Sequence, residues 1–306
     1  MTNDDIALIE RIFPEMLKRI SEAKPWKNNI FIPDMSVYRV DPRSEFMRYS
    51  TCSSRDFFHP EFKRLSDLIG IPEVFHRKYW EWVFVTHHAF AQGVTGPNTR
   101  GIVFGVGQET LPAIFAATGM RVTATDAPRD TSISQAWSTS NEYASELAAM
   151  PSGTLSREEF ESLVEWRECD MNVIPTEFKD YDLCWSSCCL EHLGSLQHGI
   201  DFIINSVENT LKIGGVAIHT TELNLSSNDH TVETGHTVLY RRKDLEQLVR
   251  QLEDRGHTVQ PFLIAPDSLV IDGFVDTPPY EAPPHLKLAL GGYVTTSAGL
   301  VIRRGK

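Results

Sequence analysis

The sequence has few cysteines, no long apolar run and no excess of basic residues. Its five cysteines are an odd number without a C-x-x-C pair, which favours reduced thiols over disulfides or structural zinc. No apolar run approaches the length of a membrane span, and the opening MTNDDIALIERIF is acidic, unlike the start of a signal peptide. These absences predict a cytoplasmic protein with no membrane partner.

The shortage of positive charge excludes a further class of partner. The formal net charge is −12 at pH 7, which opposes binding to nucleic acid phosphates or to an anionic membrane surface. With 306 residues, of which 41% are hydrophobic, the chain can bury a full core. It contains no internal repeat or low-complexity tract. We therefore expect a globular protein whose partner is a small-molecule substrate and not a nucleic acid.

The stretch that organises the chain is 100–128, RGIVFGVGQETLPAIFAATGMRVTATDAP. An apolar run without helical period at 102–104 is followed by glycines, which is typical of a buried parallel strand. Apolar residues then recur at helical spacing over 111–116, and a second apolar run covers 122–125. This pattern predicts one β-α-β unit.

Three residues of this unit indicate a nucleoside cofactor. Gly105 and Gly107 make a tight turn with an approachable backbone. Asp126 follows about twenty residues later at a strand end, where it can accept hydrogen bonds from both ribose hydroxyls. A pyrophosphate needs a third glycine, whereas Glu109 stands near this helix start and can face a cationic ligand. The pattern favours S-adenosylmethionine (SAM) over NAD, and the alternative is a β-α turn without a ligand.

Further apolar patterns flank this unit. They predict helices at 4–23, 72–92, 141–150, 156–165, 195–211 and 242–255, and strands at 29–33, 166–173, 182–185, 216–221, 258–265, 269–271 and 293–303. Ser156 and Glu159 form a predicted capping box, and Ser195 a predicted N-cap. The expected fold class is α/β: a Rossmann-like, mostly parallel seven-stranded sheet with an antiparallel final strand, plus an N-terminal helical cap. We place the cap at 1–98 and the main domain at 99–306.

Polar residues at later strand ends extend the predicted site. Asp170 and Met171 are placed to hold an adenine N6 and to cover its ring. Ser186 and Ser187, at the end of the next strand, are candidates for the amino-acid part of the cofactor. His192 lies just beyond them and is either a general base or an anchor of its loop.

A long polar excursion, LSSNDHTVETGHTVLYRR, follows the fifth strand, and such loops usually build substrate pockets. Residues of metal-binding type lie in and before it: His219, Glu222, Asp229, His230, Glu233 and His236. They lack a tight pair such as H-E-x-x-H, so we predict no metal site. Residues 1–98 are expected either to form a lid over the ligand or to pair with a second subunit in a homodimer.

Five segments, GIVFGVGQE, TATDAP, CDMNV, YDLCWSSCCLEHL and LKIGGVAIHTTE, resemble class I SAM-dependent methyltransferases from about Trp82 to the C-terminus. The resemblance implies a cofactor site made of Gly105, Gly107, Glu109, Asp126, Ala127, Asp170, Met171, Ser186 and Ser187. It also places Ser186 beside the site of methyl transfer. One departure is that Val103 replaces the acidic residue usual two positions before the first glycine.

Other segments narrow the resemblance. WEW, FGVGQETLP, SSCCLEHLGSL, HTTELNLSSN and TTSAGLVIRR are similar to a subset often linked to glycan biosynthesis. Size and cap arrangement resemble bacterial methionine S-methyltransferases of the dimethylsulfoniopropionate pathway. The two resemblances imply different methyl acceptors, a sugar hydroxyl and a thioether sulfur.

Our first hypothesis is methylation of the thioether sulfur of an amino acid, methionine, because an acidic protein rich in aromatic residues can hold the sulfonium product by cation–π contacts. The predicted substrate residues are Trp80, Trp82, Trp185, Asn224, Tyr240 and Arg241. A thioether needs no base, whereas the alternative acceptor, a sugar hydroxyl, requires one, for which the predicted catalytic residues are His192, His219 and Glu222. A third hypothesis is a non-enzymatic SAM-binding or nucleotide-binding protein.

Overall fold

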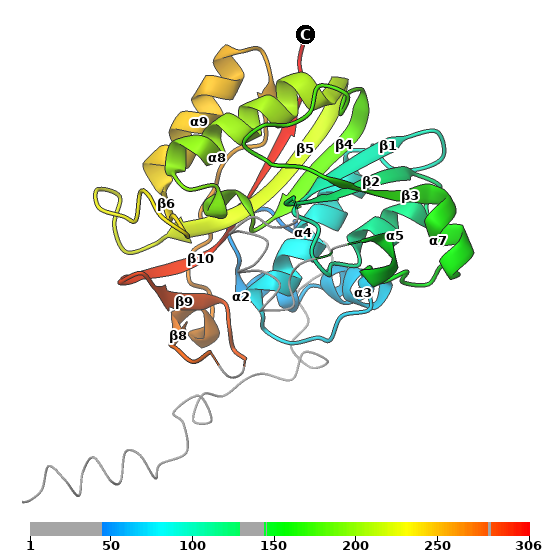
Figure 1. Ribbon diagram of the computed structural model, residues 1–306. Helices are drawn as coiled ribbons and strands as arrows, with labels where there is room; N and C mark the ends of the chain where they lie inside the picture. Colours follow the sequence, from blue (N-terminus) through cyan, green and yellow to red (C-terminus); the bar gives the residue numbers. More distant parts are fainter. Residues whose placement is uncertain (1–44, 129–143, 145, 281–282) are drawn as a thin grey trace, which may run out of the picture. The chain divides into compact units, whose positions relative to one another are not determined.

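The computed structural model describes residues 45–128, 144, 146–280 and 283–306 (Figure 1). The chain divides into two compact units, Met1–Tyr38 and Arg39–Lys306, and every statement below concerns the second. The helix predicted at 4–23 and the strand at 29–33 lie outside the described residues. Of the helix predicted at 141–150, residues 141–143 and 145 also lie outside them, and the described part contains a 3₁₀ helix, Leu147–Ala149.

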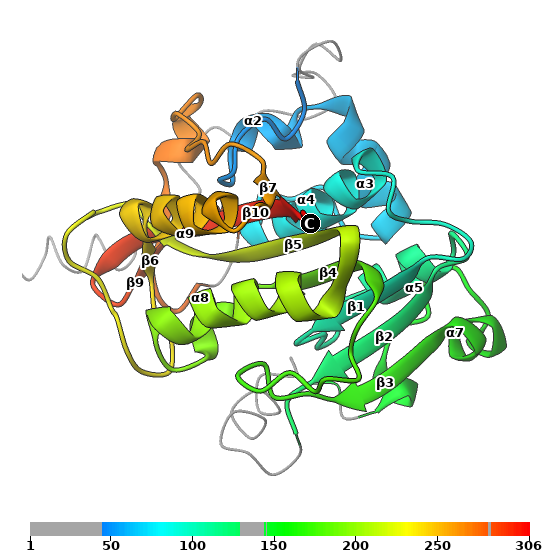
Figure 2. The same ribbon diagram turned by 90° about the horizontal axis from the view of Figure 1, so that it is seen from above.

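The described residues form one ten-stranded sheet. Its strands are β1 (Arg100–Phe104), β2 (Arg121–Asp126), β3 (Val164–Glu168), β4 (Tyr181–Ser187), β5 (Leu211–Asn224), β6 (Tyr240–Arg241), β7 (Thr258–Val259), β8 (Val275–Asp276), β9 (Lys287–Leu290) and β10 (Tyr293–Arg303). They lie in the order β3-β2-β1-β4-β5-β10-β9-β8, with β6 beside β5 and β7 beside β10. Strands β1 to β5 pair in parallel, and β10 is antiparallel to β5 (Figures 1 and 2).

The predicted α/β fold class is confirmed, including the antiparallel final strand. The sheet exceeds seven strands because β6, β7 and β8, of two residues each, extend it. The order reverses between β1 and β4, since the chain first adds β2 and β3 on one side of β1 and later β4 and β5 on the other. In open α/β sheets, ligands bind at such a reversal, outside the carboxyl ends of the strands.

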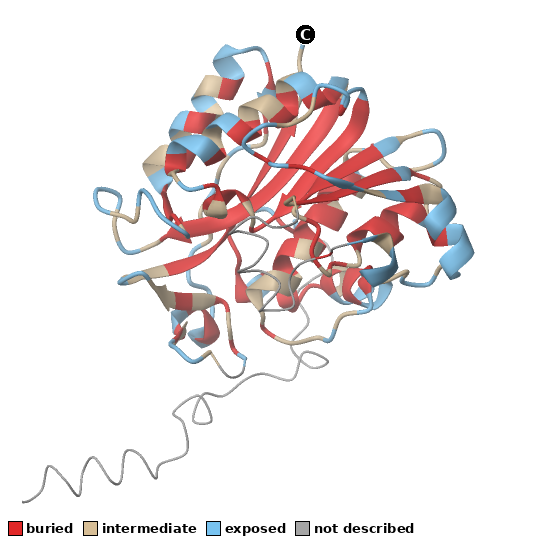
Figure 3. Ribbon diagram, in the orientation of Figure 1, coloured by how far each residue is buried: buried red, intermediate tan, exposed pale blue. Residues whose placement is uncertain are grey.

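Helices cover both faces of this sheet (Figure 1). They are α2 (Ser54–Phe57), α3 (Pro60–Ile69), α4 (Arg77–Ala91), α5 (Leu111–Ala116), α7 (Arg157–Leu163), α8 (Leu196–Asn205) and α9 (Arg242–Asp254). Alternate residues of β10 face opposite layers: Leu300 belongs to the core cluster that includes Phe202 of α8 and Leu248 of α9, whereas Gly299 lies against Phe84 of α4. The central strands are consequently buried along most of their length (Figure 3).

Local sequence explains where several helices begin. The Ser156–Glu159 capping box of α7 is confirmed, and the Ser195 hydroxyl accepts a hydrogen bond from the His198 N–H at the start of α8. Helix α4 begins five residues later than predicted from Pro72, at Arg77. The preceding residue His76 is extended, forms a β-bridge with His285 and caps the helix with its ring.

Two strand predictions near the C-terminus are wrong. Residues 269–271 belong to a short 3₁₀ helix, Val270–Gly273, because the Asp272 carboxylate accepts hydrogen bonds from the backbone of Ser268, Leu269 and Ser54 and thereby folds the segment back. In the segment 258–265 only the first two residues pair, as β7. Strands β6, β8 and β9 were not predicted from the sequence.

The segment before β1 packs on the sheet. Helix α4 lies against β4, β5 and β10, and Thr51 forms a β-bridge with Ala298 of β10. The domain boundary at 98/99 stays a prediction. No helix among the described residues is long and apolar enough to cross a membrane.

Candidate active site

A pocket opens at the carboxyl ends of β1, β2 and β4, at the reversal of strand order. Eight of the nine residues predicted to bind a cofactor line it: Gly105, Gly107, Glu109, Asp126, Ala127, Asp170, Met171 and Ser187. The ninth, Ser186, is fully buried, and its hydroxyl lies 2.9 Å from the His219 ring. Segments more than 60 residues apart in sequence therefore converge on one pocket, as the glycines and strand ends predicted.

The turn after β1 needs its glycines for conformation and for space. Gly105 and Gly107 adopt left-handed backbone angles, with φ of 66° and 49°. A Cβ on Gly105 would lie 2.6 Å from Cys189 Sγ. The Gly107 N–H donates to Asp126 Oδ2 at 3.1 Å, so the turn is tied to the end of β2.

Asp126 is a fixed hydrogen-bond acceptor on the pocket wall. Its Oδ1 accepts from the Ala127 N–H at 2.8 Å, and its Oδ2 accepts from Gly107 and from the Ala144 N–H at 3.2 Å. Burial raises the pKa of this carboxyl, while the three backbone N–H groups oppose the shift. The backbone donors orient the carboxylate and use three of its about four acceptor sites, so one site on Oδ1 can still accept from a ligand hydroxyl.

Glu109 lies in the same pocket, and Trp185 holds its side chain. The Trp185 indole Nε1 donates to Glu109 Oε1 at 2.7 Å, and the ring packs edge-on against Phe115 at 5.0 Å. Burial raises the pKa of Glu109 to about 7, although the Trp185 hydrogen bond lowers it. Trp185 was predicted to contact substrate, but its ring is fully buried and is not part of the pocket wall.

Lys78 is a pocket residue that was not predicted from the sequence. It and Trp82 line the wall from α4, four residues apart and so on one helix face. The Lys78 ammonium donates to the Ser187 carbonyl at 3.2 Å and lies 3.6 Å from Glu81 Oε2. The helical spacing of Lys78 and Trp82 was the available signal, but nothing local placed α4 at this edge of the sheet.

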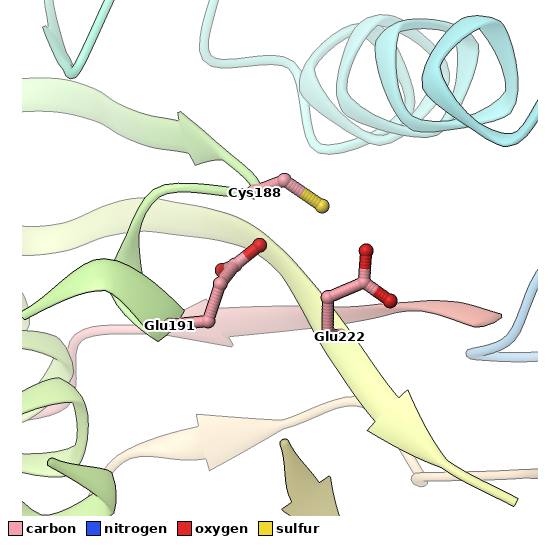
Figure 4. A group of neighbouring side chains, drawn as sticks. All are labelled: Cys188, Glu191 and Glu222. Carbon is pink, nitrogen blue, oxygen red and sulfur yellow. The ribbon is translucent and has the colours of Figure 1, made fainter. Parts of the chain in front are cut away.

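A network of buried charged side chains lies next to the pocket residue Cys188. Arg77 contacts Glu81 Oε1 at 3.2 Å and Glu222 Oε1 at 2.5 Å, and Cys188 Sγ lies 3.0 Å from Glu81 Oε1. Ligand-type atoms of Cys188, Glu191 and Glu222 lie within 4.8 Å of one another (Figure 4). The Arg77 guanidinium pairs with the Glu222 carboxylate of this group. Glu222, predicted as a base, is therefore engaged in an ion pair, and it does not line the pocket.

The two predicted histidines differ in position. His192 lines the pocket, and its Nδ1 lies 2.9 Å from the His236 carbonyl, which can only accept. The neutral ring therefore carries its proton on Nδ1, and Nε2 is the acceptor. Burial lowers the pKa of His192 to about 4.

His219 lies inside the core, away from the pocket. Its Nδ1 is 2.9 Å from Ser186 Oγ and its Nε2 is 3.1 Å from Ser206 Oγ, and burial lowers its pKa to about 3. Since Ser206 donates its own proton to the Ile203 carbonyl, it must accept from Nε2, and Nδ1 accepts from Ser186. The ring is neutral and satisfied on both sides, so it is not placed to act on a substrate.

Four other predicted substrate residues do not line this pocket. The Trp80 indole donates to Asp56 Oδ2 at 2.7 Å inside the core, and the Tyr240 hydroxyl donates to the Leu196 carbonyl at 3.3 Å. Asn224 and Arg241 hold the loop after β5 by hydrogen bonds to the carbonyls of His230 and Asp229 respectively, and Arg241 also pairs with Asp244. Their polar atoms are used within the fold.

No family model matches the chain, and no curated protein matches it. Among solved structures, a protein assigned as a sarcosine dimethylglycine methyltransferase from Galdieria sulphuraria is similar at 13% identity and a TM-score of 0.47, covering 80% of this chain and 98% of that one. A SAM-dependent methyltransferase from Clostridium acetobutylicum follows at 11% identity and a TM-score of 0.43, with the same coverage. A Burkholderia thailandensis 1,6-didemethyltoxoflavin-N1-methyltransferase with bound S-adenosylhomocysteine has 13% identity and a TM-score of 0.38, covering 72% of this chain and 76% of that one. At such values the function has to follow from the chain's own residues.

Proposed function

We propose that this chain is a SAM-dependent methyltransferase and that SAM binds in the pocket at the ends of β1, β2 and β4. The observation that carries the proposal is the joint presence of the Gly105–Gly107 turn, the oriented Asp126 carboxylate and the Glu109 carboxylate on one pocket wall. A carboxylate at the end of the second strand suits ribose hydroxyls, and one near the helix start suits a cationic ligand better than a pyrophosphate.

Different pocket residues bind the three parts of the cofactor: the ribose, the adenine and the methionine end. Asp126 accepts from a ribose hydroxyl, while Met171, which is buried, covers the adenine and Asp170, exposed at the pocket mouth, takes its N6. The methionine end lies over the glycine turn near Ser187. When bound, SAM supplies a methyl group on a sulfonium, and the protein contributes alignment of that methyl with the acceptor.

We infer that the leading acceptor is the thioether sulfur of an amino acid, methionine. The pocket wall beyond the cofactor side includes Trp82, Cys188, His192 and Leu193, of which Trp82 can stabilise a sulfonium product by a cation–π contact. A thioether needs no general base, which suits a wall whose one predicted base, His192, is a weak one with a pKa of about 4. The second candidate is a sugar hydroxyl, for which the Nε2 acceptor of His192 would take the proton.

Calorimetric titration with SAM and S-adenosylhomocysteine, followed by incubation of labelled SAM with methionine and a panel of nucleotide sugars, tests the proposal. We expect both nucleosides to bind and mass spectrometry to find the label in S-methylmethionine. Label on a sugar would select the second candidate. Failure of both nucleosides to bind would remove the proposed function.

His192→Ala distinguishes the two acceptors by rate. With a thioether acceptor we expect kcat under saturating ligands to fall by less than about tenfold, because no proton has to be removed. With a sugar acceptor a loss of about 100-fold or more is expected, since general-base catalysis contributes on that order. His198→Ala on α8, whose ring contacts the Leu193 carbonyl and does not line the pocket, is the control.

A further inference from the structure

Two opposite charges face the pocket from different helices. Lys78 enters from α4, and Glu109 lies at the turn that leads into α5. The lysine is close enough to lower the pKa of Glu109 by its charge. Neither residue is explained by adenine or ribose binding, since Asp126, Asp170 and Met171 are assigned to those parts.

Glu109 is oriented before any ligand arrives. Trp185 is buried on β4, and its Nε1 donates a hydrogen bond to Glu109 Oε1, so the indole fixes the direction of the carboxylate. The charged groups that act on it are Lys78 and Glu81 from α4, and Cys189 lies on the β4 side. Burial is the largest effect and raises the pKa of Glu109 to about 7, which marks a carboxylate short of a cationic partner.

Lys78 offers the complementary charge. Its ammonium has three N–H donors, of which one goes to the Ser187 carbonyl and one points toward Glu81 at 3.6 Å. The Ser187 hydroxyl, on a side chain only 6% exposed, lies on the pocket wall near enough to Glu109 to lower its pKa, yet makes no hydrogen bond of good geometry with a described residue. An ammonium donor and a hydroxyl donor therefore meet at one side of the pocket, a combination that suits a carboxylate.

We propose that Lys78 and Glu109 together recognise an α-amino-acid zwitterion, the methionine end of the cofactor, with Trp185 as the residue that positions Glu109. Glu109 takes the ammonium, and Lys78 with the Ser187 hydroxyl takes the carboxylate. The inference deepens the proposed function and rests on it. It also makes the segment before residue 99 part of the cofactor site, since Lys78 comes from α4.

Binding then becomes linked to protons. A carboxyl whose pKa is raised toward neutrality is partly protonated at pH 7, and an ammonium bound against it favours the charged form. Ligand binding near pH 7 should therefore release protons, and affinity should rise as the pH is raised through the pKa of Glu109 and then level off. A ligand with the same nucleoside but no amino acid should show neither effect.

The experiment compares S-adenosylhomocysteine with methylthioadenosine, which keeps adenosine and the thioether but lacks the amino acid. Calorimetry on the full chain in buffers of different ionisation enthalpy gives affinity and proton release together. For Lys78→Met and Glu109→Gln we expect S-adenosylhomocysteine to bind about 30-fold or more weakly, and methylthioadenosine to change less than about threefold. Lys78→Arg should restore part of the loss, and the exposed Lys63→Met should change nothing.

Trp185→Phe tests the positioning role. Loss of the indole hydrogen bond should move proton release to higher pH, because that bond lowers the pKa of Glu109. Proton release is measured on the wild-type chain, so this part of the test holds even if a variant does not fold. The proposal that Lys78 and Glu109 bind the zwitterion would be overturned if Glu109→Gln weakened both ligands equally. It would also be overturned if S-adenosylhomocysteine bound without releasing protons. If neither ligand binds the wild type, the proposed function itself fails.

Discussion

Replacing Arg77 by methionine is expected to lower the free energy of unfolding by about 3–5 kcal/mol, the range for a broken buried ion pair. The guanidinium contacts Glu81 at 3.2 Å, Glu222 at 2.5 Å and the Ser297 hydroxyl at 3.1 Å, and both carboxylates are almost fully buried. Methionine fills part of the space but leaves two desolvated carboxylates, of which Glu81 keeps Lys78 as a nearby cation and Glu222 loses the guanidinium that lowers its pKa. Denaturant unfolding at pH 7 measures the loss.

The size of this loss should depend on pH. Burial alone raises the pKa of Glu81, yet Lys78 and Arg77 hold it below its usual value, so its stabilising contribution is present above about pH 4.5 and is lost below. Without Arg77 the carboxyls titrate higher, and the defect should shrink as pH falls toward 5. Arg242→Met, which breaks an exposed pair with Glu246, should cost less than about 1 kcal/mol. Equal losses for the two variants would contradict the assignment of a buried network.

Gly199→Ala is expected to destabilise the protein by about 3 kcal/mol, at the upper end of the range for overpacking. A Cβ at this position on α8 would lie 1.8 Å from the Tyr240 hydroxyl oxygen and 2.9 Å from the Leu190 carbonyl oxygen. Tyr240 is fully buried, so its ring cannot move without disturbing the core, and displacing it breaks its hydrogen bond to Leu196.

Gly273→Ala is the matched control, because Gly273 has no left-handed φ and a Cβ added there would meet no heavy atom within 4 Å. Thermal unfolding of the two variants should separate them by several degrees or more. Adding Tyr240→Phe to Gly199→Ala should recover part of the loss by removing the nearest atom. A Gly199→Ala variant as stable as Gly273→Ala would show that α8 and β6 lie farther apart than the structure has them.

The predicted residues that do line the pocket are those placed by local signals. Gly105, Gly107 and Asp126 lie within one β-α-β unit, where a turn and a strand end fix their positions. Asp170, Met171 and Ser187 follow because carboxyl ends of parallel strands meet at one edge of a sheet.

The predicted site residues that do not line the pocket have partners far away in sequence. Trp185 and His219 carry polar groups that resemble ligand contacts, but one is bound to Glu109, 76 residues away, and the other lies between Ser186 and Ser206. Lys78 was missed for the same reason, because periodicity predicts that a helix exists but not which strand ends it crosses. Side-chain function is decided by tertiary partners that no local window contains.

Strand β10 sets the order in which this chain can become native during synthesis. It follows all other described helices and strands in sequence, yet it lies inside the sheet beside β5, and its Ser297 hydroxyl donates to Glu81 at 2.6 Å. Until β10 has left the ribosome, the edge of β5 that pairs with it is unpaired, and Glu81 of α4 lacks the Ser297 hydroxyl as a partner. Helix α4 is thus synthesised early, but its contacts are completed last, so this part of the fold rests on contacts of large sequence separation, which form slowly.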